Sequence, residues 1–212
     1  MTDKFNIDYS PDILPVFPLE GVLLLPNGRL PLNIFEPRYI NMINDTLASD
    51  SRMIVMTQPK KQLNIVYNIG CAGKIISFEE TVDKRYLITL EGIIRCELKE
   101  ELSEKNGYRR MKIDFTKFSE DLNKQSEDIE RVKFVGVLKK FFKSKSISAD
   151  WNIINSMNDI DLVTNLAMIC PFSNEEKQAL LEAQSFKTRA NLMITMLEMG
   201  SFEENKFNEK RH

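Results

Sequence analysis

Histidine and cysteine, which carry much of the acid–base, nucleophilic and metal chemistry of proteins, are scarce in this sequence. The single histidine is His212, in a terminal stretch that we expect to be too mobile to hold a general base in a fixed geometry. The three cysteines, Cys71, Cys96 and Cys170, lie far apart and form no C-x-x-C pair. We therefore predict no catalytic residues, no metal and no cofactor.

A phosphate-binding loop is suggested by Gly73 followed by Lys74. The pattern G-x-x-x-x-G-K-[ST] also requires a glycine five residues before Gly73 and a serine or threonine after the lysine, but these positions hold Asn68 and Ile75. We therefore interpret Gly73 as a strand glycine. The sequence contains no S-x-x-K, G-x-S-x-G or G-x-G-x-x-G motif either.

Two pairs of adjacent carboxylates could suggest acid–base catalysis. Glu79 with Glu80, and Glu100 with Glu101, stand beside predicted turns. Adjacent residues of a strand point to opposite faces of the sheet, whereas a glycosidase-like pair must face one cleft. Solvated surface charge is the favoured interpretation, and the protein is predicted not to be an enzyme.

The first half of the chain has the pattern of short strands. From Ile13 to about Phe118, β-branched and aromatic residues alternate with glycine, proline and asparagine, and the later strands are predicted at 71–80, 85–91, 93–100 and 108–118. One helix interrupts the strands. Pro37 suits its first position, and apolar residues follow at helical spacing: Tyr39, Ile40, Ile43 and Leu47.

The second half is helical. Ser173 and Glu176 have the spacing of a capping box, Ser185 is expected to cap the last helix, and Gly200 to end it. These signals divide the chain into a flexible N-terminus, a β domain, a linker, a helical bundle and a flexible tail, at residues 1–12, 13–118, 119–128, 129–200 and 201–212.

A basic helix is predicted from about Asp128 to Lys145, with Phe134, Phe141 and Phe142 among its lysines. Such a helix could lie on a membrane surface or bind a partner. A bundle helix with a wide buried stripe and a solvated rim is the favoured interpretation.

Bulk properties argue against several partners. The formal net charge is -2 and the isoelectric point is about 5.7, so no global attraction to nucleic acid or to an anionic membrane is expected. The polar N-terminal stretch 1–11 does not resemble an export signal, and the longest apolar runs are too short to span a bilayer. A soluble protein of the reducing cytoplasm is predicted. The oligomeric state is not predicted.

Several spaced blocks resemble the Lon N-terminal, or Lon substrate-binding, domain. The blocks are Phe17–Leu19, Val22–Pro26, Leu30–Tyr39, Ile69–Ile75 and Tyr86–Arg95, and the most specific is I-F-E-P-R-Y at 34–39. The resemblance covers roughly residues 13–200. It implies an α+β fold, in which an N-terminal PUA-like β pseudo-barrel with one inserted helix is followed by a C-terminal helical bundle.

The resemblance also implies a function. Full-length Lon enzymes continue into an ATPase and a serine-lysine protease, and this chain has the motifs of neither. It is therefore expected to be a stand-alone, non-catalytic module that recognises unfolded or partly folded polypeptides. It could serve as an adaptor or regulator in proteolysis, with a protease or another protein as partner.

The I-F-E-P-R-Y block has a structural interpretation. Pro37 presets the first helical φ, Phe35 and Tyr39 can pack inward, and Glu36 with Arg38 can form a charge-assisted pair that fixes the corner. A direct role in ligand binding for Glu36 or Arg38 is the alternative.

Candidate polypeptide contacts follow from the physics of unfolded chains, which expose apolar side chains and unpaired backbone. Leu19, Pro31, Ile76 and Phe78 lie near the early loops and the predicted hairpin around Val82, where the resemblance also suggests polypeptide contact. Each of these residues could instead belong to the core.

RNA binding is the rival hypothesis, because PUA-like barrels also occur in RNA-binding proteins. A local phosphate-binding face could be formed by five basic residues: Lys60, Lys61, Arg109, Arg110 and Lys112. The acidic isoelectric point and the lack of an evident base-stacking motif argue against it, so nucleic acid is not an expected partner.

Overall fold

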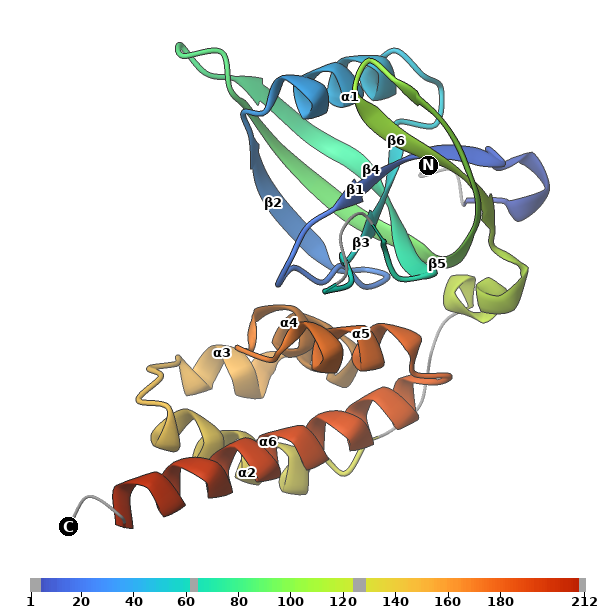
Figure 1. The fold of residues 1–212 in the computed structure, drawn as a ribbon. Helices are drawn as coiled ribbons and strands as arrows, with labels where there is room; N and C mark the ends of the chain where they lie inside the picture. Colours follow the sequence, from blue (N-terminus) through green and yellow to red (C-terminus); the bar gives the residue numbers. More distant parts are fainter. Residues whose placement is uncertain (1–4, 62–64, 124–128, 210–212) are drawn as a thin grey trace. The chain divides into compact units, whose positions relative to one another are not determined.

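The computed structural model describes residues 5–61, 65–123 and 129–209, with side chains up to residue 202. These residues form two compact units. A β unit comprises the described part of 1–124 together with 171–181, and a helical unit comprises the described parts of 125–170 and 182–212 (Figure 1).

The β unit contains six strands, one α-helix from the first half of the chain, two short 3₁₀ helices and most of a later helix. The strands are β1 (Ile13–Pro18), β2 (Arg29–Ile34), β3 (Met53–Thr57), β4 (Ile69–Glu80), β5 (Tyr86–Lys105) and β6 (Tyr108–Asp114). The helices are η1 (Ile7–Tyr9), α1 (Pro37–Leu47), η2 (Thr116–Leu122) and α5 (Asn174–Glu182). Tyr9 of η1 is exposed at the surface.

The strands form one mixed sheet in the order β2-β5-β4-β3-β1-β6. The β1–β3 pair is parallel, and the other pairs are antiparallel. The far half of β5 also pairs with β6, so the sheet curls back on itself into a pseudo-barrel. Val16, Ile54, Leu90 and Ile94 of these strands are fully or almost fully buried.

Strand β5 is a single element of 20 residues, so the prediction of two strands at 85–91 and 93–100 is wrong. In the sequence, Gly92 suggested a break between two strands. It is instead required inside the strand, because a Cβ there would lie 2.1 Å from the backbone oxygen of Leu25. Gly73 lies within β4 against the Leu24 side chain, which confirms the interpretation as a strand glycine.

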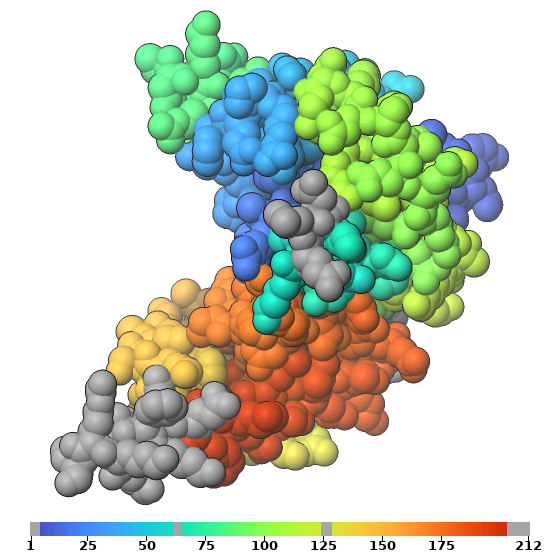
Figure 2. Space-filling view, viewed as in Figure 1, coloured from blue at the N-terminus to red at the C-terminus, as the bar shows by residue number. Residues whose placement is uncertain are grey.

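The β4–β5 hairpin extends past β3, whose pairing with β4 covers only Met53–Met56 and Cys71–Lys74. Its tip is at the upper left of Figure 1, and Figure 2 shows it standing out from the β unit. Thr81 N donates to Arg85 O at 2.9 Å, and Lys84 has a positive φ of 61°. The hairpin predicted around Val82 is thereby confirmed.

Helix α1 begins at Pro37, as predicted. It buries one stripe on the barrel, formed by Tyr39, Met42, Ile43 and Thr46. The spacing of these residues is that of an amphipathic helix whose apolar side faces a core.

Helix α5 belongs to the β unit, whereas the sequence division placed all of 129–200 in the bundle. The predicted capping box starts it: Ser173 N donates to Glu176 Oε2 at 2.7 Å, and Glu176 N donates to Ser173 Oγ at 3.2 Å. Its buried polar side chains donate to barrel backbone, Lys177 Nζ to Gly21 O at 2.7 Å and Gln178 Nε2 to Ile69 O at 3.2 Å.

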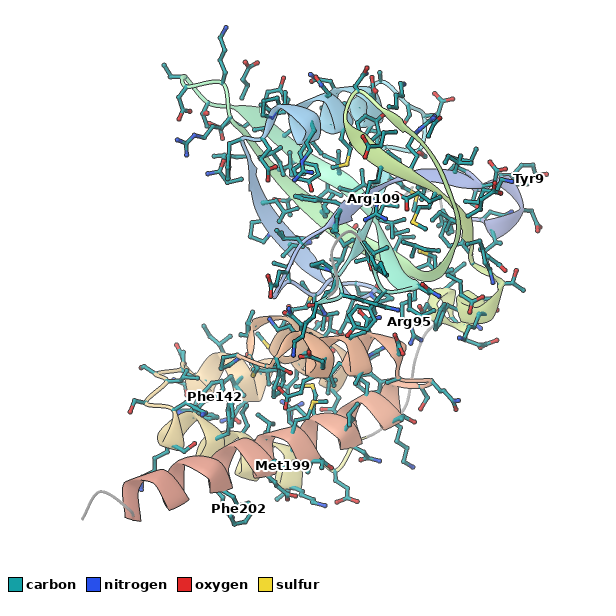
Figure 3. All side chains as sticks on the ribbon, viewed as in Figure 1. Tyr9, Arg95, Arg109, Phe142, Met199 and Phe202 are labelled. Carbon is teal, nitrogen blue, oxygen red and sulfur yellow. The ribbon has the colours of Figure 1, made fainter. Side chains whose placement is uncertain are left out.

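The helical unit contains α2 (Arg131–Ser144), α3 (Trp151–Ser156), α4 (Asp159–Ile169) and α6 (Phe186–Glu209). Phe134, Leu138, Phe141 and Phe142 of α2 are buried, and Figure 3 labels Phe142 there. The basic helix is therefore a bundle helix, which was the favoured interpretation.

Helix α6 continues through Gly200 to Glu209, so the prediction that Gly200 ends the helix is wrong, and residues 201–209 of the expected tail are helical. A Cβ at Gly200 would lie 2.7 Å from the Phe141 ring, which gives this glycine a packing role. The N-terminal cap is as predicted, with Thr188 N donating to Ser185 Oγ at 3.1 Å. Residues 210–212, including His212, lie outside the described residues.

Together the pseudo-barrel and the helices confirm the predicted α+β class. Among the described residues, no helix is both long and apolar enough to cross a membrane.

Candidate functional site

Exposed apolar side chains gather on the β2–β5–β4 section of the sheet. Ile76 and Phe78 of β4 are 42% and 43% exposed, and Val82 at the hairpin tip and Leu87 of β5 are exposed beside them. We refer to Phe35, Ile76, Phe78, Val82 and Leu87 as the hairpin cluster. Ile76 and Phe78, at its centre, were predicted from the sequence as polypeptide contacts, and both lie at the surface.

The hairpin cluster has two faces, because neighbouring strand residues point to opposite sides. Phe78 stands on the face of Ile88, its partner on β5, and its ring meets that of Tyr86 edge-to-face with centroids 4.8 Å apart. Tyr86 in turn donates to Asn44 Oδ1 of α1 at 3.1 Å. Leu87 points to the opposite face.

The remaining two predicted polypeptide contacts, Pro31 and Leu19, lie at different distances from the cluster. Pro31 is exposed and lies opposite Thr89, which is also opposite Ser77 of β4. It therefore shares the sheet section with the cluster. Leu19 is half-buried at the end of β1, where its N–H donates to Thr57 O at 3.0 Å. That point is near the start of β4, and the cluster is near its end.

Phe35 is 62% exposed, so the expectation that it packs inward is wrong. The side chain follows the last residue of β2 and lies beneath Arg85, whose guanidinium carbon is 5.9 Å from the ring centroid. Because Ile34 is already buried, strand alternation directs Phe35 outward. This alternation could have predicted the exposure of Phe35 from the sequence, because Phe35 precedes Glu36-Pro37 and so continues the strand and not the helix.

The rest of the I-F-E-P-R-Y block behaves as predicted. Glu36 Oε2 accepts from Arg38 Nη2 at 2.8 Å and from its Nε at 3.0 Å. Tyr39 is buried and its ring packs on Phe17 with centroids 4.3 Å apart. Pro37 occupies the first turn of α1.

Helix α1 is also fixed to the turn between β5 and β6. Asp45 Oδ2 accepts from Tyr108 Oη at 2.7 Å and pairs with Lys105 Nζ at 3.1 Å. The hydrogen bond from Tyr108 is the main cause that lowers the pKa of Asp45. Gly107 has a φ of +86°, and a Cβ there would lie 3.3 Å from the Arg38 Cβ.

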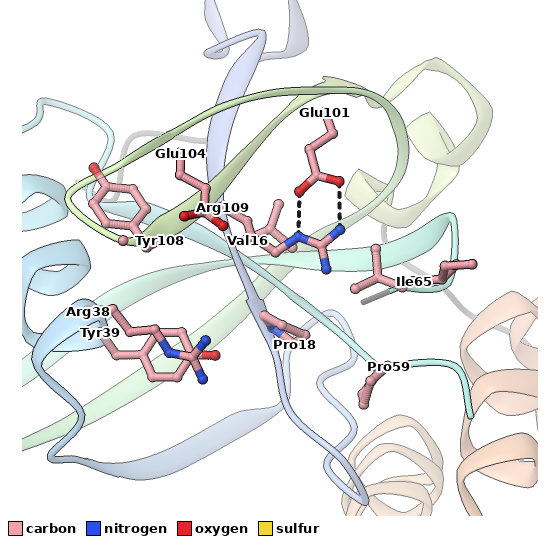
Figure 4. A pocket seen from close by; sticks show the side chains of 12 residues that line it. Val16, Pro18, Arg38, Tyr39, Pro59, Ile65, Glu101, Glu104, Tyr108 and Arg109 are labelled. Carbon is pink, nitrogen blue, oxygen red and sulfur yellow. Dashed lines mark hydrogen bonds and ion pairs between the residues drawn. The ribbon is translucent and has the colours of Figure 1, made fainter. Parts of the chain in front are cut away.

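A pocket of about 380 Å³ opens between these elements (Figure 4). Its walls combine apolar and charged side chains from α1, β1, β5, β6 and the segment before β4, including Pro18, Arg38, Tyr39, Ile65, Glu104 and Arg109. Arg109 forms a two-point ion pair with Glu101, with Nε–Oε1 and Nη2–Oε2 both 2.6 Å. Burial raises the pKa of the Tyr39 hydroxyl above its usual value.

The pocket has the chemistry of a side-chain receptor. It offers apolar walls, two guanidinium groups and two carboxylates, a mixture that can contact both polar and apolar groups of a ligand. Sequence reasoning noted Arg38 as an alternative ligand residue, but it did not bring Arg109 and Glu101 to the same place. Only the pairing of β5 with β6 does so.

The basic residues of the RNA hypothesis are largely paired with acidic partners. Lys61 pairs with Glu175 at 2.7 Å, Arg109 with Glu101, and Lys112 with Glu100 at 2.6 Å. Arg110 Nη2 donates to Ser103 O, and Lys60 lies over the Tyr67 ring. Glu100 and Glu101 thus form ion pairs at the surface, as the interpretation of these carboxylates as surface charge predicted.

All three cysteines are buried. Burial raises the pKa of the Cys96 thiol far above its usual range, which suppresses the reactive thiolate. Cys96 is therefore core filling.

Solved structures of Lon N-terminal domains share this fold. The Lon N-terminal domain protein from Xanthomonas campestris aligns with a TM-score of 0.64 at 17% identity, covering 86% of this chain and 97% of that one. The N-terminal domain of the Mycobacterium avium complex Lon protease gives 0.61 at 15%, covering 89% and 97%. The fold is thus that of a Lon N-terminal domain.

The chain belongs to the family of ATP-dependent protease La (LON) substrate-binding domains, whose family model matches residues 13–199. Among curated proteins it is similar to the Lon protease of Malacoplasma penetrans, 28% identical over 201 residues, and to Lon protease 2 of Myxococcus xanthus, 24% identical over 205 residues. These alignments cover 87% and 91% of this chain but 25% and 24% of the relatives. The chain therefore spans about a quarter of their length, and the match is to a substrate-recognition domain.

Proposed function

We propose that this protein binds unfolded or partly folded polypeptides through exposed apolar segments, and that it acts by binding and not by turnover. The hairpin cluster is the observation that carries the proposal. A domain that keeps two aromatic rings and three aliphatic side chains exposed on the two faces of one section of sheet has the property required to recognise apolar segments.

Membership of the Lon substrate-binding family supports the same function. The family is named for binding the substrate of a protease, and a protease's substrate is a polypeptide. We further propose that the protein works as an adaptor or regulator in proteolysis, with a protease or another protein as partner. A reducing cytoplasm is the proposed location, because the cysteines are scattered and buried.

RNA binding finds no support in the ion pairs. Cations already held by carboxylates at 2.6–2.7 Å would have to exchange partners to neutralise phosphate. A salt titration distinguishes RNA binding from polypeptide binding. Affinity that depends on phosphate contacts falls steeply as salt rises, whereas affinity for apolar segments does not.

The test compares binding of one model protein in its native form and in a reduced, carboxymethylated form, measured by fluorescence anisotropy. We expect binding to the unfolded form alone. Replacing Ile76 and Phe78 together by serine should weaken that binding about tenfold or more, because the complex then buries neither apolar side chain.

A matched control replaces two exposed apolar residues of the helical unit, Val132 and Ile153, by serine. This variant should bind like the wild type. Equal failure of the wild type to bind either form of the model protein would overturn the proposal, and equal loss in both variants would remove the hairpin cluster as its site.

A further inference from the structure

The end of β4 has an open backbone edge. The pairing of β3 with β4 stops at Lys74, and the last backbone contact on that side is Ile75 N donating to Arg52 O at 2.9 Å. Residues 76–80 continue the strand, pair with β5 on their other side, and are all exposed. Among the described residues no strand pairs with this edge.

The hydrogen-bond pattern shows which groups point outward. Thr81 N donates to Arg85 O, so 81 and 85 form a hydrogen-bonded pair. Such pairs alternate with non-bonded ones along an antiparallel ladder, and the register 79↔87 and 77↔89 continues the bonded set. The N–H and C=O groups of Phe78 and Glu80 are therefore directed away from β5, to the open edge.

The other free edge of this section is interrupted by a proline. Gly92 N donates to Gly28 O at 2.9 Å, so by the same alternation Arg29, Pro31 and Asn33 of β2 direct their backbone outward. Pro31 has no N–H to offer at the centre of that edge. The end of β4 lacks a proline, so it retains the donors that a new strand needs.

We propose that the open edge of β4 binds an extended polypeptide segment by strand addition, with its backbone paired to Phe78 and Glu80. This inference rests on the proposed function and specifies how the client is bound. Only an extended backbone supplies donors and acceptors at the two-residue spacing of Phe78 and Glu80. An apolar side chain opposite Phe78 then lies beside the ring pair of Phe78 and Tyr86.

Charge selects the occupant. Glu79 and Glu80 are exposed, and in the part of the chain that the structure describes neither has an ion-pair partner. A client with lysine or arginine between its apolar residues places opposite charge beside Glu79. A second copy of this chain would instead bring four carboxylates into one strand pair, which like-charge repulsion disfavours.

The first test uses an eight-residue peptide in which valine alternates with lysine, and two versions that are N-methylated on every valine or on every lysine. In an antiparallel pair, valine opposite Phe78 exchanges both backbone hydrogen bonds with it, so methylation of valine should weaken binding roughly 5- to 100-fold by removing about two bonds. Methylation of lysine should change it less than about twofold. Equal affinities of all three peptides would overturn strand addition and leave apolar capture intact.

The second test changes the protein. Glu80→Pro removes the outward N–H of Glu80 without touching the ladder to β5, and Glu80→Ala removes the same charge but keeps the N–H. Glu80→Pro should weaken peptide binding severalfold beyond Glu80→Ala, at unchanged circular dichroism. If Glu80→Pro fails to fold, the methylated peptides still decide the question.

The outcomes separate the two proposals. Failure of the unmethylated peptide and of the unfolded model protein to bind would remove the proposed function itself. Binding of the unfolded protein with no preference among the three peptides removes only strand addition. Dimers in sedimentation that dissociate in Glu80→Pro would assign the edge to a second copy and overturn the peptide as its occupant.

Discussion

Arg95 and Asp121 form a buried two-point ion pair in the β unit. Arg95 Nη2 donates to Asp121 Oδ1 at 2.7 Å and its Nε donates to Oδ2 at 2.9 Å, with side chains only 4% and 1% exposed. Arg95 Nη1 also donates to Leu181 O at the end of α5. The pair thus joins β5 to η2 and α5.

Removing one member of this pair should destabilise the protein strongly. Arg95→Met leaves the Asp121 carboxylate buried without its cation, which costs about 3–5 kcal/mol. Urea unfolding measures the loss. Arg29→Met, at an exposed ion pair with Glu91, is the control and should cost less than about 1 kcal/mol. Similar losses in the two variants would contradict the role assigned to Arg95.

Two glycines should respond to alanine in opposite ways. Gly92→Ala places a Cβ against the Leu25 carbonyl and should cost about 3 kcal/mol or more. Gly136→Ala, in α2, has open space around the new methyl group and should stabilise the helical unit by about 0.5–1 kcal/mol. Thermal unfolding of both variants checks the signs. A tolerated Gly92→Ala would show that the strand backbone moves freely there.

The capping box should control how firmly α5 is held. Ser173→Ala removes the acceptor for Glu176 N and should cost about 1 kcal/mol. Hydrogen exchange of the α5 amides should become faster, including those around Lys177 and Gln178. Ser173→Thr keeps the hydroxyl and serves as the control. Unchanged exchange in Ser173→Ala would mean that packing alone holds the helix.

Acid should weaken the contact between α1 and the β5–β6 turn. The folded pKa of Asp45 is lowered by the hydrogen bond from Tyr108, so its stabilising effect is complete above the unfolded value of about 3.9. The effect is lost as pH falls through the lower folded value. The free energy of unfolding, measured in urea between pH 6 and 3, should therefore fall less with decreasing pH in Asp45→Asn than in the wild type. Asp50→Asn is the control, and identical slopes in all three proteins would refute the prediction.

Local signals in the sequence determined many of the elements. Pro37 presets the start of α1, and the Ser173–Glu176 spacing starts α5, because a proline φ and a capping hydrogen bond depend on residues within one helical turn. The alternation of strands and the helical period determined the α+β class for the same reason. The I-F-E-P-R-Y block indicated the family.

Tertiary structure alone decided the rest. Gly92 and Gly200 had the appearance of ends, but each is required by a distant group, the Leu25 carbonyl and the Phe141 ring. The pocket pair of Arg109 and Glu101 depends on the register of two strands, and the open edge at Phe78 depends on where a third strand stops. Such features arise from contacts between different strands and helices, and the local pattern of a single element contains only one side of each contact.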